Sequence, residues 1–170
     1  MIKILICLLV LTNIISCATV STSPKTVGSN FNLEEILNNA EANTSNNGRR
    51  ILETSRAMIS DKEIVVGGCW NYINKVYNRA GFSTKQRLTI FKSKLKGPYV
   101  KGDRIEPGDW LYFVNHSYSG SEHSAIFVDW TDEERKLALM VSYEGENRKK
   151  PAMYKEYNLS NIYNIIRAND

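Results

Sequence analysis

The stretch PGDWLYFVNHSYSGSEHSAIFVDWTDEERKLALMVSY, residues 107–143, decides the fold. It contains three apolar runs, Trp110–Val114, Ser124–Trp130 and Leu137–Tyr143, which a polar loop and a charged turn separate. Apolar runs of this length between turn residues predict strands. Because connections this short join neighbouring strands that run in opposite directions, we expect an antiparallel sheet.

The segments on either side of this stretch complete the fold class. Upstream, apolar residues recur at helical spacing over residues 49–59 and again over Cys69–Ala80, where Gly81 follows as the C-cap. Downstream, Ile162–Ile166 predicts a strand that closes the sheet, whereas the lysine-rich connector 83–106 is ambiguous. Helices that come first and antiparallel strands that follow indicate an α+β domain, with N-terminal helices packed on an antiparallel β-sheet.

Composition and charge exclude several function classes. The 170 residues are 42% hydrophobic and 24% charged, which is typical of one globular domain and not of a disordered chain. The net charge of +4 is too small for a nucleic-acid-binding surface, so we expect no nucleic acid partner. We also expect a monomer. The basic residues of 85–104 leave two interpretations open: a solvated connector, or a basic face that attracts anionic polymers of the cell envelope.

The N-terminus is typical of an exported lipoprotein. Lys3 precedes an apolar run, Ile4–Ile15, which has the length of a signal peptide and is too short to span a bilayer. Residues 14–17, IISC, resemble a bacterial lipobox, in which the signal is cut before a cysteine that then carries the lipid. The alternative is a plain signal peptide, or an uncleaved anchor, in which Cys17 is incidental.

These features divide the chain into three parts. We expect a lipoprotein signal peptide at residues 1–16, a lipidated Cys17 with a flexible tether at residues 17–47, and a folded domain at residues 48–170. The tether is rich in Ser, Thr and Asn and contains a short helical pattern at Leu33–Ala40. We therefore expect a protein of the cell envelope that is anchored to a membrane through its N-terminal lipid, and to the outer membrane if the cell has one.

Cysteine usage singles out one thiol. Cys7 is lost with the signal peptide and Cys17 carries the lipid, so Cys69 is the free thiol of the mature chain. It lies at the predicted start of a helix, just after two glycines, where free backbone N–H groups and the helix dipole favour an anion. Such a position lowers a thiol pKa from about 8.5 and activates the thiolate as a nucleophile.

A cysteine nucleophile needs a base, and a third polar group that orients the base. His123 immediately precedes an apolar strand and is therefore held by a rigid element, whereas His116 lies in a polar loop where we expect it to be solvated. Three residues at or after the end of the next strand are candidates for the third group: Ser142, Glu144 and Asn147.

The register of the predicted hairpin chooses among these candidates. If Trp130 pairs with Leu137, His123 lies opposite Glu144, at a Cβ separation of about 4.5–5.5 Å. This is close enough for a carboxylate to orient an imidazole. A register shift by two residues would place Ser142 there instead, so Glu144 is the first choice and Ser142 the second.

Three motifs resemble those of papain-like cell-wall hydrolases. Gly68–Gly81 (GCWNYINKVYNRAG) resembles the catalytic helix of NlpC-type peptidases and of the related CHAP amidohydrolases. Pro107–Phe113 (PGDWLYF) resembles their Pro-Gly-Asp strand, and His123–Val128 (HSAIFV) resembles their His-Val-Gly-Ile-Tyr-Val strand. The similarity covers about residues 60–145. The chain departs from the NlpC pattern because Gly-Cys-Trp-Asn stands where Asp-Cys-Ser-Gly is usual, and because no tyrosine lies between Gly48 and Gly68.

The resemblance implies a papain-like fold in which Cys69 is the nucleophile, His123 the base and Glu144 the acidic third residue of the CHAP branch. It implies cleavage of amide bonds in peptidoglycan stem peptides or crosslinks. We expect no cofactor, and a substrate cleft that includes Gly68, Trp70 and Ser142. Two histidines and one available thiol also provide no spaced set of metal ligands. The alternative is a catalytically inactive, envelope-binding lipoprotein of the same fold, in which Trp70 blocks the cleft. Acyl transfer by the same pair is a further alternative.

Overall fold

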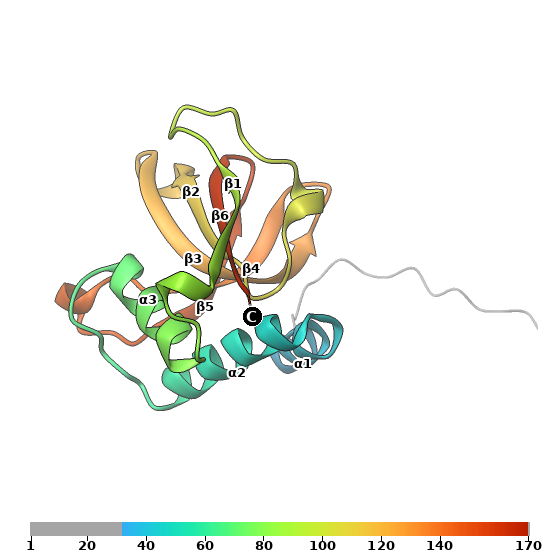
Figure 1. Cartoon of the computed structure of the whole chain (residues 1–170). Helices are drawn as coiled ribbons and strands as arrows, with labels where there is room; N and C mark the ends of the chain where they lie inside the picture. The colour runs from blue at the N-terminus through green and yellow to red at the C-terminus, as the bar shows by residue number, and fades with distance from the viewer. Residues whose placement is uncertain (1–31, 170) are drawn as a thin grey trace, which may run out of the picture. The chain divides into compact units, whose positions relative to one another are not determined.

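The computed structural model describes residues 32–169, in which helices come first and an antiparallel sheet follows (Figure 1). The three helices are α1 (Leu33–Asn43), α2 (Asn46–Ser60) and α3 (Cys69–Arg79). The strands are β1 (Arg87–Lys92), β2 (Trp110–Asn115), β3 (Ser121–Asp132), β4 (Leu137–Ser142), β5 (Met153–Asn158) and β6 (Ile162–Ala168). Short 3₁₀ turns are η1 (Thr84–Gln86), η2 (Gly102–Arg104), η3 (His116–Tyr118) and η4 (Glu146–Arg148). The predicted α+β class, with helices on an antiparallel sheet, is confirmed.

The strand order of the sheet is β1-β6-β2-β3-β4-β5, and every neighbouring pair is antiparallel. The predicted strand at 162–166 is real, but β6 lies inside the sheet between β1 and β2 and is not at an edge. The two edge strands, β1 and β5, were not predicted. Both contain charged and polar residues, which protect an edge strand from pairing with other chains. β5 has no apolar alternation, and β1 alternates only over Arg87–Ile90, within a lysine-rich connector.

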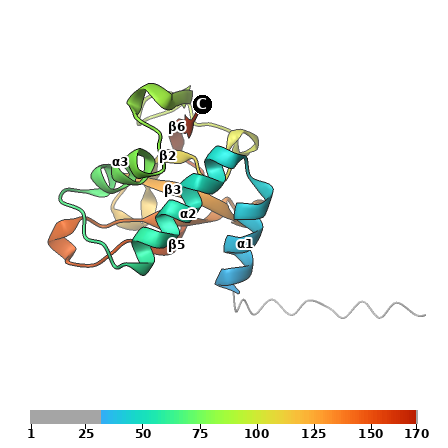
Figure 2. The same ribbon diagram turned by 60° about the horizontal axis from the view of Figure 1, so that its bottom comes forward.

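The helices cover one face of the sheet (Figure 2). Side chains of β3 alternate between the two faces of the sheet. Ser124, Ile126 and Val128 are buried on the side of the helices. Ile126 and Val128 belong to a hydrophobic cluster that includes α3 residues such as Val76. The residues between them face a second cluster on the other side, which includes Phe127. Each strand residue therefore has a fixed side, and this determines which side chains can meet.

The ordered domain begins earlier than predicted. Leu37 and Ala40 of α1 are only 3% and 2% exposed and belong to the cluster under the helices. The expected flexible tether of 17–47 is therefore wrong for α1, because an apolar stripe that is buried against α2 holds this helix on the domain. The signal peptide, Cys17 and the tether up to residue 31 lie outside the described residues.

The described residues carry their own core. The residues of both buried clusters lie between Leu37 and Ala168, so a fragment of residues 31–170 contains the whole hydrophobic core. We therefore expect that fragment to fold on its own. No helix among the described residues combines the length and the hydropathy needed to cross a bilayer.

The Pro107–Asp109 turn fixes the start of β2. Gly108 has φ +97°, and a Cβ atom there would come within 2.6 Å of the Cα atom of Gly48 in α2, so only glycine allows this close approach. Asp109 is 1% exposed, and its carboxylate accepts two hydrogen bonds from Arg167 of β6, each 2.8 Å long. The turn thus links α2, β2 and β6.

Candidate active site

The first turn of α3 presents the Cys69 thiol, as the sequence predicted. Gly67 has φ +104°, and the Asn71 side-chain oxygen accepts a hydrogen bond from the backbone N–H of Gly68 at 3.0 Å. A Cβ atom on Gly67 would lie 2.3 Å from that oxygen, so both the backbone conformation and the space require glycine. The first helical hydrogen bond runs from Tyr72 N–H to the Gly68 carbonyl at 3.2 Å, which places Cys69 at the helix N-terminus.

The loop after β4 is fastened beside this turn. The backbone N–H of Glu146 donates to the Gly67 carbonyl at 3.0 Å, and the Cβ that Gly145 lacks would lie 3.7 Å from the Cα atom of Gly68. Figure 2 shows the loop, in orange, next to the beginning of α3. The end of β4 and the residue before the thiol are therefore held together, although they are far apart in the sequence.

His123 lies in β3, which begins three residues earlier than predicted, at Ser121. Its imidazole is flanked by two rings, with centroids at 5.6 Å for Phe113 and 5.4 Å for Tyr157. Nε2 lies 3.0 Å from Ser142 Oγ. Because Nε2 is occupied by this hydrogen bond, Nδ1 is the ring nitrogen left to exchange a proton with the thiol.

The third group next to His123 is Ser142, which the sequence gave as the second choice. The assumed pairing of Trp130 with Leu137 is wrong: Trp130 pairs with Ala138. An irregularity between Phe127 and Asp129 then brings Ile126 opposite Val141, which restores the assumed register near His123, but the ladder ends there and does not extend to a pair of His123 with Glu144. On the described part of β4, Ser142 is the last residue, and its side chain is on the same face as His123.

The carboxylate of Glu144 turns away from the imidazole. It accepts a hydrogen bond from Lys155 Nζ of β5 at 3.4 Å, and both side chains are more than a third exposed. Glu144 comes two residues after β4 ends, where the chain no longer follows β3. Among the described residues, Ser142 and not Glu144 is the hydrogen-bond partner of His123.

Ser142 connects His123 to a second hydroxyl. Ser142 is 1% exposed, and its Oγ lies 2.8 Å from the Tyr157 hydroxyl. Lys155 Nζ lies 5.4 Å from the centroid of the Tyr157 ring, which adds a cation–π contact. When His123 is an imidazolium, Nε2–H donates to the Ser142 oxygen. Either hydroxyl can donate in the next hydrogen bond, between Ser142 and Tyr157.

The thiol of Cys69 has a pKa suited to a nucleophile. Burial raises the pKa, but hydrogen bonding to His123 and Ser124 and the charge of His123 lower it by more, to about 7. The buried Ser124 hydroxyl has no partner of normal hydrogen-bond geometry among the described residues, but it is close enough to the sulfur to stabilise the thiolate. The thiolate is therefore a larger fraction of Cys69 at neutral pH than the few per cent of an ordinary cysteine.

Cys69 and His123 line one cavity of about 370 Å³. Gly68 lines it as predicted, whereas Ser142 lies behind His123 and does not reach it. Its charged lining residues are two acids and two bases: Glu122, Glu144, Arg148 and Lys155. Asn115, Tyr118, Ser121, Tyr143 and Tyr157 complete the lining.

Trp70 does not block this cavity. Its side chain is not among the lining residues, and its ring lies against Trp110 with a centroid separation of 5.7 Å. The residue is 48% exposed. Trp70 thus lies outside the cavity, next to the helix start. The other histidine, His116, is exposed in η3 and contacts Asn161. It does not line the cavity and is therefore not a candidate for the base.

Several residues of the site were not among the sequence candidates, including Ser124, Arg148, Lys155 and Tyr157. The last two belong to β5, which has no apolar alternation, so no signal placed them beside the hairpin. No group of three or more His, Cys, Asp or Glu side chains in residues 32–169 is arranged to hold a metal ion.

No protein-family model, curated protein or solved structure matches this chain. The likeness to NlpC-type and CHAP enzymes therefore rests on the three short motifs. The case for a function depends on the geometry of Cys69, His123 and their cavity.

Proposed function

We propose that this protein is a lipid-anchored cysteine hydrolase with a papain-like arrangement, which cleaves amide bonds in peptidoglycan peptides. One observation carries the proposal: a thiol with a pKa of about 7 and an imidazole that is fixed at Nε2 line the same cavity of about 370 Å³. Buried cysteines that only fill a core have raised pKa values, so a lowered pKa at a cavity favours a reactive thiol.

The reaction follows from the two groups. The Cys69 thiolate attacks the carbonyl carbon of the amide, and the electron pair moves to the carbonyl oxygen. The backbone N–H of Cys69, which has no acceptor within the first turn of α3, is placed to stabilise that oxyanion. His123 then gives its Nδ1 proton to the leaving amine, which departs and leaves a thioester on Cys69.

The second half of the reaction restores the thiolate. His123, now neutral, takes a proton from water as the water oxygen attacks the thioester carbon. The thioester breaks, the carboxylic acid product leaves, and the imidazolium–thiolate pair forms again. Ser142 holds Nε2 throughout, so the ring does not have to reorient between the two steps.

The substrate class rests on the cavity and on the predicted location. A lining with both carboxylates and basic side chains suits a peptide that carries charges of both signs better than an apolar ester. The lipobox-like residues 14–17 predict a position in the cell envelope, where peptidoglycan is the abundant amide polymer.

The test is digestion of purified muropeptides by the unlipidated fragment 31–170, with products identified by mass spectrometry. Cys69→Ala and His123→Ala should abolish product formation. His116→Ala is the matched control, because it removes the other histidine, which is exposed and does not line the cavity. This variant should retain activity. Equal product patterns from all four proteins would disprove the assignment.

A catalytically inactive envelope-binding protein of the same fold is the second candidate. It is favoured by the neutral Ser142 next to His123, since a hydroxyl stabilises an imidazolium less than a carboxylate does. In that case muropeptides would bind to the wild type and to Cys69→Ala with the same affinity, and neither protein would release a product. Isothermal titration next to the digestion separates the two functions.

A further inference from the structure

The positive charge of this protein is concentrated in the segment 92–104, which runs from the last residue of β1 toward β2. The segment contains five of the 22 Lys and Arg residues and one of the 18 Asp and Glu residues, so 17 of each sign remain elsewhere. The net charge of +4 therefore belongs entirely to these thirteen residues. Its cations are Lys92, Lys94, Lys96, Lys101 and Arg104.

The backbone of the segment is fixed at both ends. The Ser93 N–H donates to the Tyr163 carbonyl at 2.7 Å, and the Val100 N–H donates to the Ile162 carbonyl at 2.9 Å. The segment is therefore hydrogen-bonded to β6, which is an inner strand. A connector that is tied down in this way presents its side chains in a defined arrangement.

The tip of the segment is a closed turn. The Gly97 N–H donates to the Lys94 carbonyl at 2.8 Å, with Gly97 at φ +92°. The Tyr99 hydroxyl donates to the Leu95 carbonyl at 3.0 Å. Lys94 and Lys96 thus flank Leu95, whose side chain is 42% exposed.

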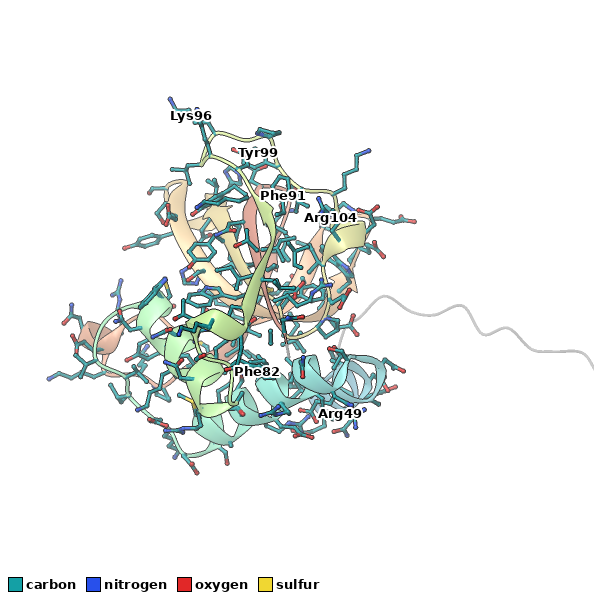
Figure 3. The ribbon with its side chains drawn as sticks, in the orientation of Figure 1. Arg49, Phe82, Phe91, Lys96, Tyr99 and Arg104 are labelled. Carbon is teal, nitrogen blue, oxygen red and sulfur yellow. The ribbon has the colours of Figure 1, made fainter. Side chains whose placement is uncertain are left out.

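The tip points away from the helices (Figure 1), and Figure 3 shows Lys96 and Tyr99 at its end. None of the residues of 92–104 lines the cavity that holds Cys69. All four lysines are exposed, and none forms an ion pair in the described part of the chain. The segment is therefore a charged surface separate from the candidate active site.

We propose that segment 92–104 binds the surface of an anionic phospholipid bilayer, with the lysines on lipid phosphates and Leu95 among the upper acyl groups. Basic side chains near an anionic leaflet each contribute to binding, and an apolar side chain adds to it when it enters the interface. A soluble anionic polymer would engage the lysines but would leave Leu95 in water. The exposed leucine between two lysines is what favours a membrane over such a polymer.

The test is co-sedimentation of the unlipidated fragment 31–170 with vesicles of equal parts phosphatidylglycerol and phosphatidylcholine, and with phosphatidylcholine alone. The wild type should bind only the anionic vesicles, and less at high salt. Lys94→Ser/Lys96→Ser should weaken binding about 30-fold. Lys149→Ser/Lys150→Ser removes the same charge from another exposed loop and should bind like the wild type.

A second pair of variants tests the leucine. Leu95→Ser should weaken vesicle binding about tenfold, whereas Leu33→Ser, at a leucine that is 38% exposed on α1, should have no effect. Circular dichroism melting of each variant confirms that it is folded. No binding of the wild type to anionic vesicles would overturn the proposal. So would wild-type vesicle binding by Leu95→Ser together with competition by soluble polyglutamate, which would identify a polymer as the partner.

Discussion

His123 Nε2 and Ser142 Oγ lie 3.0 Å apart, and this contact brings a buried hydroxyl to the imidazole that faces the thiol. Ser142 in turn contacts the hydroxyl of Tyr157 at 2.8 Å. The orienting group of this site is therefore neutral, and the thiolate depends on its direct neighbours for stability.

Removal of the Ser142 hydroxyl should slow catalysis without weakening substrate binding. In Ser142→Ala, Nε2 loses its partner and the ring is held less firmly, so we expect kcat to fall about tenfold, the value of one hydrogen bond, while KM is unchanged. Steady-state kinetics on a muropeptide measures both constants. The exposed Ser83→Ala is the control, and a wild-type kcat for Ser142→Ala would contradict an orienting role.

Glu144→Gln should behave differently. Its carboxylate binds Lys155 at 3.4 Å on the surface, and exposed ion pairs contribute less than about 1 kcal/mol. We therefore expect kcat and the pKa of Cys69 to stay close to those of the wild type. A loss of activity larger than that of Ser142→Ala would restore Glu144 as the third catalytic residue.

The alkylation rate of Cys69 should rise with pH through an inflection near 7, since its pKa is about 7 and the thiolate is the reactive form. Ser124→Ala removes a group that lowers this pKa, so its inflection should move to higher pH and its labelling at pH 7 should slow. Iodoacetamide labelling followed by mass spectrometry gives the profile for Cys69. An inflection above pH 8 in the wild type would contradict the proposed thiolate–imidazole pair.

Asp109→Asn should destabilise the domain. Asp109 is buried and paired with Arg167, and removing one charge of such a pair leaves the other uncompensated, at a cost of about 3 kcal/mol. Urea denaturation of fragment 31–170 measures the change in free energy of unfolding. Glu106→Gln, which alters the more exposed partner of the same Arg167, should cost less.

The sequence was most informative where apolar residues alternate or recur. β2, β3 and β4 were predicted to within three residues at each end, and α3 begins at Cys69 as expected. The edge strands were missed because β5 has no apolar alternation and β1 alternates only over Arg87–Ile90, inside a lysine-rich connector. A strand whose ladder partner lies at the other end of the chain, as β1 pairs with β6, has no local signal.

The residues of the candidate site likewise divide into those with a local sequence signal and those without one. Cys69 and His123 were identified because a helix start and a strand are local features. The choice between Glu144 and Ser142 depended on where the β3–β4 ladder ends: Ile126 pairs with Val141 in the assumed register, but the ladder stops there and β4 ends at Ser142. Nothing in the sequence marks this end of the ladder. Tyr157 could not be assigned without β5.

The position of β6 has a consequence for folding. Among the described strands β6 comes after all the others in the sequence, yet it joins β1 to β2, so β1 has no ladder partner until β6 is in place. A sheet that depends on such a distant pairing forms more slowly than one whose strands pair in order. A chain that stops before Ile162 would have no strand to bridge the gap.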